Sequence, residues 1–122
     1  MIQSCVTFLP VSDIQKTEEF YTKVVGLTLW DDQGKCKIFN CGQGYWGFCQ
    51  YDDGRPLATG VCLSLNMEDT ADVDEKFRNV KAAGAEILQK PEHHKNFPVY
   101  SCFVKDPDGY LLEFQKILHE GK

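Results

Sequence analysis

Six cysteines are the residues of this sequence best suited to metal binding or redox chemistry, but their spacing fits neither. No two of them are separated by only two residues, so the usual zinc and thiol-exchange patterns are absent. Most lie in apolar stretches, such as residues 61–63 and 101–103, where a free cysteine behaves as a small buried hydrophobe. We therefore predict six free thiols with mainly packing roles, and we leave a reactive thiol open for one of them. The six are Cys5, Cys36, Cys41, Cys49, Cys62 and Cys102.

Two adjacent histidines, His93 and His94, lie in a polar loop predicted over residues 91–96. Neighbouring side chains of an extended segment point in opposite directions, so the pair is poorly placed to bind one metal ion. We interpret both as solvated loop residues and leave open that one of them touches a ligand. His119 is given no role. The sequence contains no P-loop, no GxGxxG pattern and no Ser–His–Asp order.

The composition limits the classes of protein to which the chain can belong. Its 122 residues suffice for one domain with an ordinary core, and 43% hydrophobic and 25% charged residues are typical of a soluble globular protein. A net charge of −5 without a basic cluster argues against binding to nucleic acid. The lack of a long apolar run argues against a membrane protein and against a secretory signal. We therefore expect a cytoplasmic protein.

The first half of the sequence is predicted to contain a strand, a helix and three further strands. Residues 5–11 form the first strand. The helix begins near Ser12, which with Gln15 fits a capping box, or near Asp13 as the alternative cap. Apolar residues recur at helical spacing up to Gly26, which ends the helix. The three strands that follow are expected over residues 27–30, 35–41 and 45–51.

The second half repeats this order of elements. We expect a strand over residues 60–66, a helix over 69–83, and strands over 85–89, 99–105 and 110–117. We interpret the halves as two modules, about residues 1–53 and 58–118, of a single domain that spans residues 1–122. The matching residues are Gly26 with Gly84, Gly44–Tyr45 with Gly109–Tyr110, and Gln50 with Gln115.

Two segments of the chain resemble the vicinal-oxygen-chelate superfamily, which includes glyoxalase I, bleomycin-resistance proteins, fosfomycin-resistance enzymes and extradiol dioxygenases. One is the opening of the chain, at residues 11–14, 20–21 and 26–27. The other is the strand–turn–strand of residues 103–114 with its Asp-Pro-Asp-Gly turn. The resemblance implies an α+β fold of two βαβββ modules, whose strands form a curled mixed sheet, a cup with flanking helices. One fold hosts many activities, so it implies no particular reaction.

In the metal-using members of this superfamily, each module supplies one metal ligand from its first strand and one from its last. The four corresponding positions here are Val6, Phe48, Gly60 and Glu113. Valine, phenylalanine and glycine side chains cannot bind a metal, so Glu113 is the only matching ligand, and we predict no metal and no other cofactor. A register shifted by one residue would bring in Cys5 or Cys49 instead, and a Cys/Cys/Glu set would suit zinc.

The inner face of the implied cup follows from the alternation of side chains along strands. If Glu113 points inward, its counterparts form an apolar, aromatic pocket with one carboxylate, as small-molecule sites often are. We predict that the ligand is bound by Phe8, Trp46, Phe48, Gln50, Cys62, Ser64 and Glu113. The alternative is that Trp46 and Phe48 only fill a core between sheet and helix. Three roles are open for Glu113: a vestigial ligand position, a partner for a cationic ligand, or a general base.

Two functions are compatible with these features, and the resemblance leaves open whether the protein is an enzyme. The first is a metal-free small-molecule-binding protein similar to the bleomycin-resistance proteins, which the resemblance implies to be a homodimer with an aromatic or cationic ligand. The alternative is a metal-dependent lyase, isomerase or thiol transferase of the glyoxalase I type. A purely structural or interaction module has no positive feature in its favour.

Overall fold

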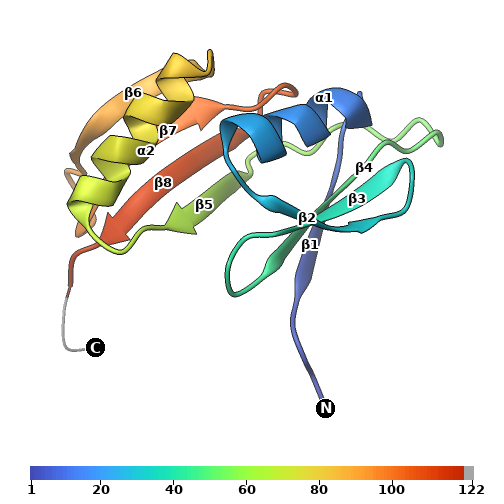
Figure 1. Ribbon diagram of the computed structural model, residues 1–122, viewed down its shortest axis with the longest axis horizontal. Helices are drawn as coiled ribbons and strands as arrows, with labels where there is room; N and C mark the ends of the chain where they lie inside the picture. Colours follow the sequence, from blue (N-terminus) through green and yellow to red (C-terminus); the bar gives the residue numbers. More distant parts are fainter. Residues whose placement is uncertain (120–122) are drawn as a thin grey trace. The chain divides into compact units, whose positions relative to one another are not determined.

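The computed structural model describes residues 1–119 and divides the chain into two compact units. The first unit spans Met1–Gly60, and the second begins at Val61. Each unit has one four-stranded mixed sheet and its own helix, in the predicted order of one strand, a helix and three strands (Figure 1). The α+β class and the βαβββ repeat are therefore confirmed. The interpretation of both modules as one domain stays a prediction.

The first unit contains β1 (Val6–Pro10), α1 (Ile14–Glu19), a π-helical turn η1 (Phe20–Val24), β2 (Thr28–Asp32), β3 (Cys36–Asn40) and β4 (Tyr45–Cys49). Its strands lie in the order β1-β4-β3-β2. The outer strand β1 runs parallel to β4, whereas the other neighbours are antiparallel. The parallel pair follows from the helix, because a crossover connection is needed to return the chain in the same direction.

The start of α1 is set by Asp13, the second of the two predicted caps. The Asp13 carboxylate accepts hydrogen bonds from the backbone N–H groups of Gln15 and Lys16, at 3.0 and 3.3 Å. The Gln50 side chain, at the end of β4, accepts a third from the N–H of Ile14 at 2.9 Å. The helical segment stops before Gly26, whose φ of 93° lies in the left-handed region that favours glycine.

The second unit contains β5 (Cys62–Asn66), α2 (Thr70–Ala82), β6 (Glu86–His93), β7 (Val99–Lys105) and β8 (Leu111–Ile117). The strand order β5-β8-β7-β6 repeats that of the first unit, with β5 parallel to β8. Asp69 caps α2 by accepting from the N–H of Asp72, as Asp13 caps α1. The strand β6 is longer than predicted and continues through Pro91 to His93, because two register irregularities absorb the residues that cannot pair regularly.

In each unit the helix covers one face of the sheet, and the buried side chains lie mostly between them. In the second unit α2 contacts β6, β7 and β8 (Figure 1). The side chains of Val73, Val80, Leu112 and Phe114 there are fully buried. The Tyr100 hydroxyl reaches across from β7 to donate to the Asp74 carboxylate of α2 at 2.7 Å. No helix among residues 1–119 has the length and apolarity needed to cross a bilayer.

Candidate ligand-binding site

The candidate site lies on the face of the second sheet that points away from α2, which we call the open face. Tyr100, Leu112 and Phe114 mark the helix-covered face, since the first bonds to α2 and the other two are fully buried. Strand alternation and the register of β5, β8 and β7 place the remaining side chains on the opposite side. On these three strands the open face comprises Cys62, Ser64, Asn66, Val99, Ser101, Phe103, Lys105, Leu111, Glu113, Gln115 and Ile117. On the outer strand β6 it includes Glu86, Gln89 and Glu92, the Cα partners of Lys105, Phe103 and Ser101.

Glu113 is the only carboxylate of this face on β5, β7 and β8, whereas Glu86 and Glu92 lie on the outer strand β6. Two neighbours on β5 hold Glu113. Ser64, its Cα partner in the adjacent strand, donates a hydrogen bond from Oγ to Glu113 Oε1 at 2.9 Å. The Cys62 thiol lies 3.9 Å from the same oxygen. Desolvation and the Glu113 charge raise the pKa of the Cys62 thiol. The thiol therefore stays protonated at neutral pH and serves as a weak donor rather than as a nucleophile.

The charge of Glu113 is not balanced by a basic side chain. In the part of the chain that the structure describes, ion pairs join Lys37, Arg55 and Lys105 to carboxylates, and none of them involves Glu113. Its two side-chain donors, Ser64 and Cys62, are neutral when the thiol is protonated. A half-buried carboxylate with neutral donors attracts a cation or an N–H group.

The equivalent place in the first unit is apolar. Phe8 pairs with Gly47 in the same position of the parallel ladder as Ser64 pairs with Glu113. The Phe8 ring fills the space that a side chain at position 47 would need, because a Cβ there would lie 2.5 Å from ring atoms Cδ1 and Cε1. The second unit thus has the Ser64 hydroxyl and the Glu113 carboxylate at this place, whereas the first unit has the Phe8 ring packed against Gly47, which has no side chain.

This register corrects two predicted correspondences. Gly47, not Phe48, is the counterpart of Glu113, and Cys62, not Gly60, is the counterpart of Val6. The match of Gly44–Tyr45 with Gly109–Tyr110 is misleading because Tyr45 is the first residue of β4, whereas Tyr110 precedes β8. In β4 the error is one residue, which is enough to move every side chain of a strand to the other face, whereas in β5 it is two residues, which leaves the face unchanged.

Three of the residues predicted to bind the ligand therefore lie on the helix-covered side of the first sheet and not on its open face. Trp46 and Phe48 point toward the helical segment, where their rings pack on Tyr21 and are 8% and 0% exposed. The Gln50 amide oxygen accepts from the N–H of Ile14 at the start of α1, so this side chain too is engaged on the helical side. Cys62, Ser64 and Glu113 meet on the open face of the second sheet, and Phe8 lies on the corresponding face of the first sheet. That these four residues bind a ligand stays a prediction.

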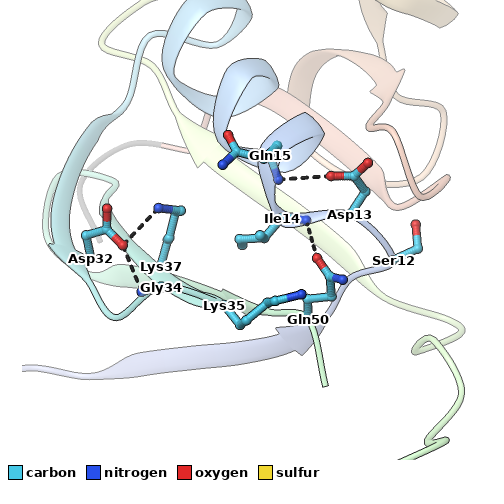
Figure 2. A pocket seen from close by; sticks show the side chains of 9 residues that line it. All are labelled: Ser12, Asp13, Ile14, Gln15, Asp32, Gly34, Lys35, Lys37 and Gln50. Carbon is cyan, nitrogen blue, oxygen red and sulfur yellow. Dashed lines mark hydrogen bonds and ion pairs between the residues drawn. The ribbon is translucent and has the colours of Figure 1, made fainter. Parts of the chain in front are cut away.

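A hollow of about 630 Å³ lies elsewhere in the first unit, beside the start of α1 (Figure 2). Its polar groups are engaged with one another. Lys37 is paired with Asp32 at 2.8 Å, and Asp32 also accepts from the N–H of Gly34. The hydrogen bond from Lys37 lowers the pKa of Asp32, and the same bond raises the pKa of Lys37. These contacts tie β2 to β3, and within residues 1–119 the hollow has no buried side-chain nitrogen or oxygen that lacks a hydrogen-bond partner.

Both histidines are exposed, as predicted, but only His94 lies in the loop. His93 ends β6, and its ring packs on Tyr100 with 4.9 Å between centroids, so it lies on the helix-covered side of the sheet. His94 begins the following turn, where Nδ1 accepts from the N–H groups of Asn96 and Phe97 at 2.9 and 3.2 Å. The two rings serve different local contacts, which agrees with the expectation that they do not face one ion.

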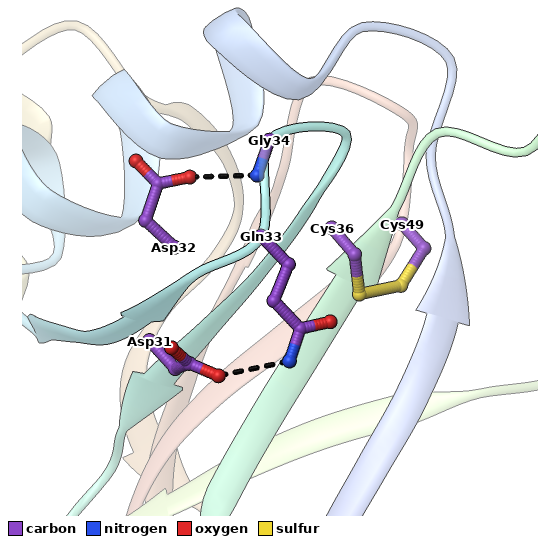
Figure 3. Close-up of a disulfide and its surroundings, with 6 residues drawn as sticks. All are labelled: Asp31, Asp32, Gln33, Gly34, Cys36 and Cys49. Carbon is purple, nitrogen blue, oxygen red and sulfur yellow. Dashed lines mark hydrogen bonds between the residues drawn. A yellow bond between two sulfur atoms is a disulfide. The ribbon is translucent and has the colours of Figure 1, made fainter.

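The prediction of six free thiols is wrong. Cys36 and Cys49 are Cα partners in the β3–β4 ladder and are joined by a disulfide (Figure 3). The free cysteines are Cys5, Cys41, Cys62 and Cys102. Cys102 has the predicted packing role, because it is fully buried and burial raises the pKa of its thiol to about 12.

The residues present do not make the four-ligand metal centre that the resemblance implies. With the corrected register, the four positions hold Val6, Gly47, Cys62 and Glu113, so the first unit supplies no donor atom. Within residues 1–119, no three histidine, cysteine, aspartate or glutamate side chains are grouped so that they could hold a metal ion. The second unit offers one thiol and one carboxylate, which is fewer than the three protein ligands of a typical catalytic zinc site.

The model of the Glyoxalase/Bleomycin resistance protein/Dioxygenase superfamily matches residues 2–114. The chain belongs to this superfamily. Its members bind small-molecule substrates. A Vibrio cholerae serotype O1 protein named "Probable lactoylglutathione lyase" is 30% identical over 133 residues, which cover 94% of this chain and 92% of the relative.

One further relative resembles the chain in sequence, and one solved structure resembles it in fold. The lactoylglutathione lyase of Escherichia coli O157:H7 is 28% identical over 123 residues, covering 88% of this chain and 87% of that protein. The crystal structure of a glyoxalase/bleomycin resistance protein/dioxygenase from Nocardioides shares the fold, with a TM-score of 0.79 at 18% identity, over 100% of this chain and 87% of that one. These names do not support the prediction of a metal-free protein, and a metal-dependent enzyme is compatible with them.

Proposed function

We propose that this member of the superfamily binds a small molecule with a cationic or N–H donor group through Glu113, without a resident metal ion. The observation that carries the proposal is the Glu113 carboxylate, held by Ser64 at 2.9 Å on the open face and paired with no basic residue among residues 1–119. Val6 and Gly47 support the metal-free part, because these two of the four ligand positions have no side-chain donor atom.

The geometry indicates how Glu113 would act. Ser64 and Cys62 both contact Oε1, so they fix the orientation of the carboxylate and direct Oε2 toward an incoming group. A charge-assisted hydrogen bond from a ligand N–H to Oε2 would then form without reordering the side chain. Glu113 thus binds and orients the ligand in this proposal, and no proton transfer is required of it.

The test is a calorimetric titration with benzylammonium and, as its neutral counterpart, benzyl alcohol. We expect the cation to bind more tightly, and Glu113→Gln to weaken its binding by about 1–3 kcal/mol while the melting temperature is retained. Glu68→Gln is the matched control, because Glu68 is exposed in the loop before α2 and the variant removes the same charge. Equal binding of both probes, or equal losses in the two variants, would overturn the proposal.

A metal-dependent lyase, isomerase or thiol transferase of the glyoxalase I type is the second candidate. It is favoured by the relative named probable lactoylglutathione lyase, which is 30% identical over 94% of this chain. Elemental analysis after dialysis decides between the two. Well under one equivalent of zinc, nickel, iron or manganese per chain is expected for the binding protein. One equivalent, together with formation of lactoylglutathione, would establish the enzyme.

We also propose that the protein is a homodimer. The supporting observation is that β1 and β2 are the edges of the first sheet, and β5 and β6 those of the second. Edge strands of this kind need protection from uncontrolled pairing, and a second copy can supply it. Light scattering at micromolar concentration should give twice the chain mass, and a monomer would contradict the proposal.

A cytoplasmic location is likewise a proposal. It is supported by the composition and by the four free cysteines, which are typical of a reducing compartment. The Cys36–Cys49 disulfide argues in the other direction, since such bonds are rare in the cytoplasm. Fractionation of the source cells, with detection of the chain by antibody, is the direct measurement.

A further inference from the structure

Ser101 in β7 lies on the open face, next to the Glu113 strand. Its sequence neighbours Tyr100 and Cys102 belong to the other face, because Tyr100 bonds to α2 and Cys102 is fully buried. Alternation therefore turns Ser101 toward the open side. Its Cα partners are Gln115 in β8 and Glu92 in β6. Ser101 and Glu113 are thus diagonal neighbours in the β7–β8 ladder, about 7–8 Å apart.

The Ser101 hydroxyl is buried and unused by the fold. The residue is 1% exposed, and its Oγ is the only buried side-chain nitrogen or oxygen among residues 1–119 without a hydrogen-bond partner. The neighbouring amides are engaged elsewhere. Gln115 donates to Asn66 at 3.0 Å, and Gln89 donates to the backbone oxygen of Ser101 rather than to its hydroxyl. An unpaired buried hydroxyl costs about 1–3 kcal/mol, so alanine would serve the free protein better.

We propose that Ser101 is a ligand-binding residue, and that Ser101 and Glu113 together bind a planar cation of the amidinium or guanidinium class. The inference rests on the proposed function, because it adds a second contact to the Glu113 site. A ligand N–H would donate to Oγ and supply the hydrogen bond that the hydroxyl lacks in the free protein. This accounts for a serine at a position where the fold itself makes no use of the oxygen.

A planar cation fits the spacing of these groups better than a compact ammonium. An amidinium presents N–H groups in a fixed plane on two nitrogens, so one can reach Glu113 and the other Ser101, whereas an ammonium is a point charge. Phe103 lies beside both, since it is the Cα partner of Glu113 and two residues from Ser101 on the same face. Its half-buried ring offers an aromatic surface on which a flat cation can stack.

The test compares benzamidine with its neutral analogue benzamide and its anionic analogue benzoate, by titration calorimetry of the full chain. We expect benzamidine to bind most tightly and more tightly than benzylammonium, and benzoate to show no binding. Ser101→Ala should weaken benzamidine about fivefold or more, leave benzylammonium binding nearly unchanged, and keep or raise the melting temperature. Ser101→Cys, close to serine in volume but a poor hydrogen-bonding group, should act in the same direction, and Ser4→Ala is the control at an exposed serine.

The outcomes separate this inference from the function on which it rests. If Glu113→Gln weakens benzamidine but both Ser101 variants bind it like the unaltered protein, the role of Ser101 is refuted and the Glu113 site stands. The same holds if benzylammonium binds and benzamidine does not. If the Ser101 variants instead lose several degrees of melting temperature, the hydroxyl has a structural role and the inference is overturned. Loss of the Glu113 effect itself would overturn both.

Discussion

The ring of Tyr21 stacks on the ring of Phe48, with 4.5 Å between centroids and 18° between planes. Both side chains are fully buried, and Phe39 and Trp46 close the cluster around them. This contact joins the helical segment of the first unit to the centre of its sheet. It also explains why Phe48 cannot be part of an open ligand site, since its ring has no face left for a ligand.

We expect Phe48→Ala to destabilise the protein by about 3–5 kcal/mol, because it removes a fully buried ring from a packed core. Phe8→Ala is the matched comparison, since the same truncation is made at a ring that is 48% exposed, and it should cost far less. Chemical denaturation measures both. If Phe48→Ala kept normal stability but lost ligand binding, the result would contradict the core role of Phe48 and support its place in the ligand site.

Gly47→Ala should cost about 1 kcal/mol, because the new methyl group takes the place of the Phe8 ring, which must turn toward solvent. The cost should vanish in a Phe8→Ala background, where no ring has to move. A double-mutant cycle in urea measures this coupling. Equal losses in both backgrounds would show that the backbone, rather than Phe8, resists a side chain at position 47.

The unfolded, unreduced protein should expose four reactive thiols of the six cysteines to a thiol reagent, and all six after reduction. Replacing Cys36 with serine should lower the free energy of unfolding by about 2–4 kcal/mol, because the crosslink no longer restricts the unfolded chain. The same replacement at Cys41, a free cysteine beyond the other end of β3, is the control. Six reactive thiols before reduction would contradict the disulfide.

Asp32 should contribute to a loss of stability in acid. The hydrogen bond from Lys37, followed by that from the N–H of Gly34, lowers the pKa of Asp32 below its ordinary value of 3.8. Its contribution is therefore present above that pH and is lost as the pH falls through the lower pKa of the folded state. Asp32→Asn should flatten this part of the profile, measured as urea midpoints between pH 2 and 5, and Asp31→Asn should not. A profile unchanged by Asp32→Asn would contradict the prediction.

The order of elements could be predicted because it depends on local signals. Gly26 and Gly84 end the helical segments, and the turn at 106–109 sets the β7–β8 hairpin. The contact between Ser64 and Glu113 could also be predicted, since the alternation of side chains along two neighbouring strands is enough to place both on one face.

The remaining features depend on register, which a single sequence specifies weakly. The sequence assigns Phe48 instead of Gly47 as the first-unit counterpart of Glu113, an error of one residue. The cause is that the same Gly-Tyr pair lies at different distances from the starts of β4 and β8. Cys36 and Cys49 are 13 residues apart, and only the pairing of β3 with β4 brings them together. Ser101 could have been placed from the same hairpin that places Glu113, but the lack of a partner for its hydroxyl is visible only in three dimensions.

The Cys36–Cys49 bond closes residues 36–49 into a covalent ring that contains all of β3, the turn after it and all of β4. A protease that cuts inside this ring opens a loop and separates nothing, since the two ends stay attached through the sulfur atoms. The cut chain stays one covalent molecule until a reductant breaks the disulfide. The reducing capacity of its surroundings therefore decides whether such a cut divides the protein or leaves it whole.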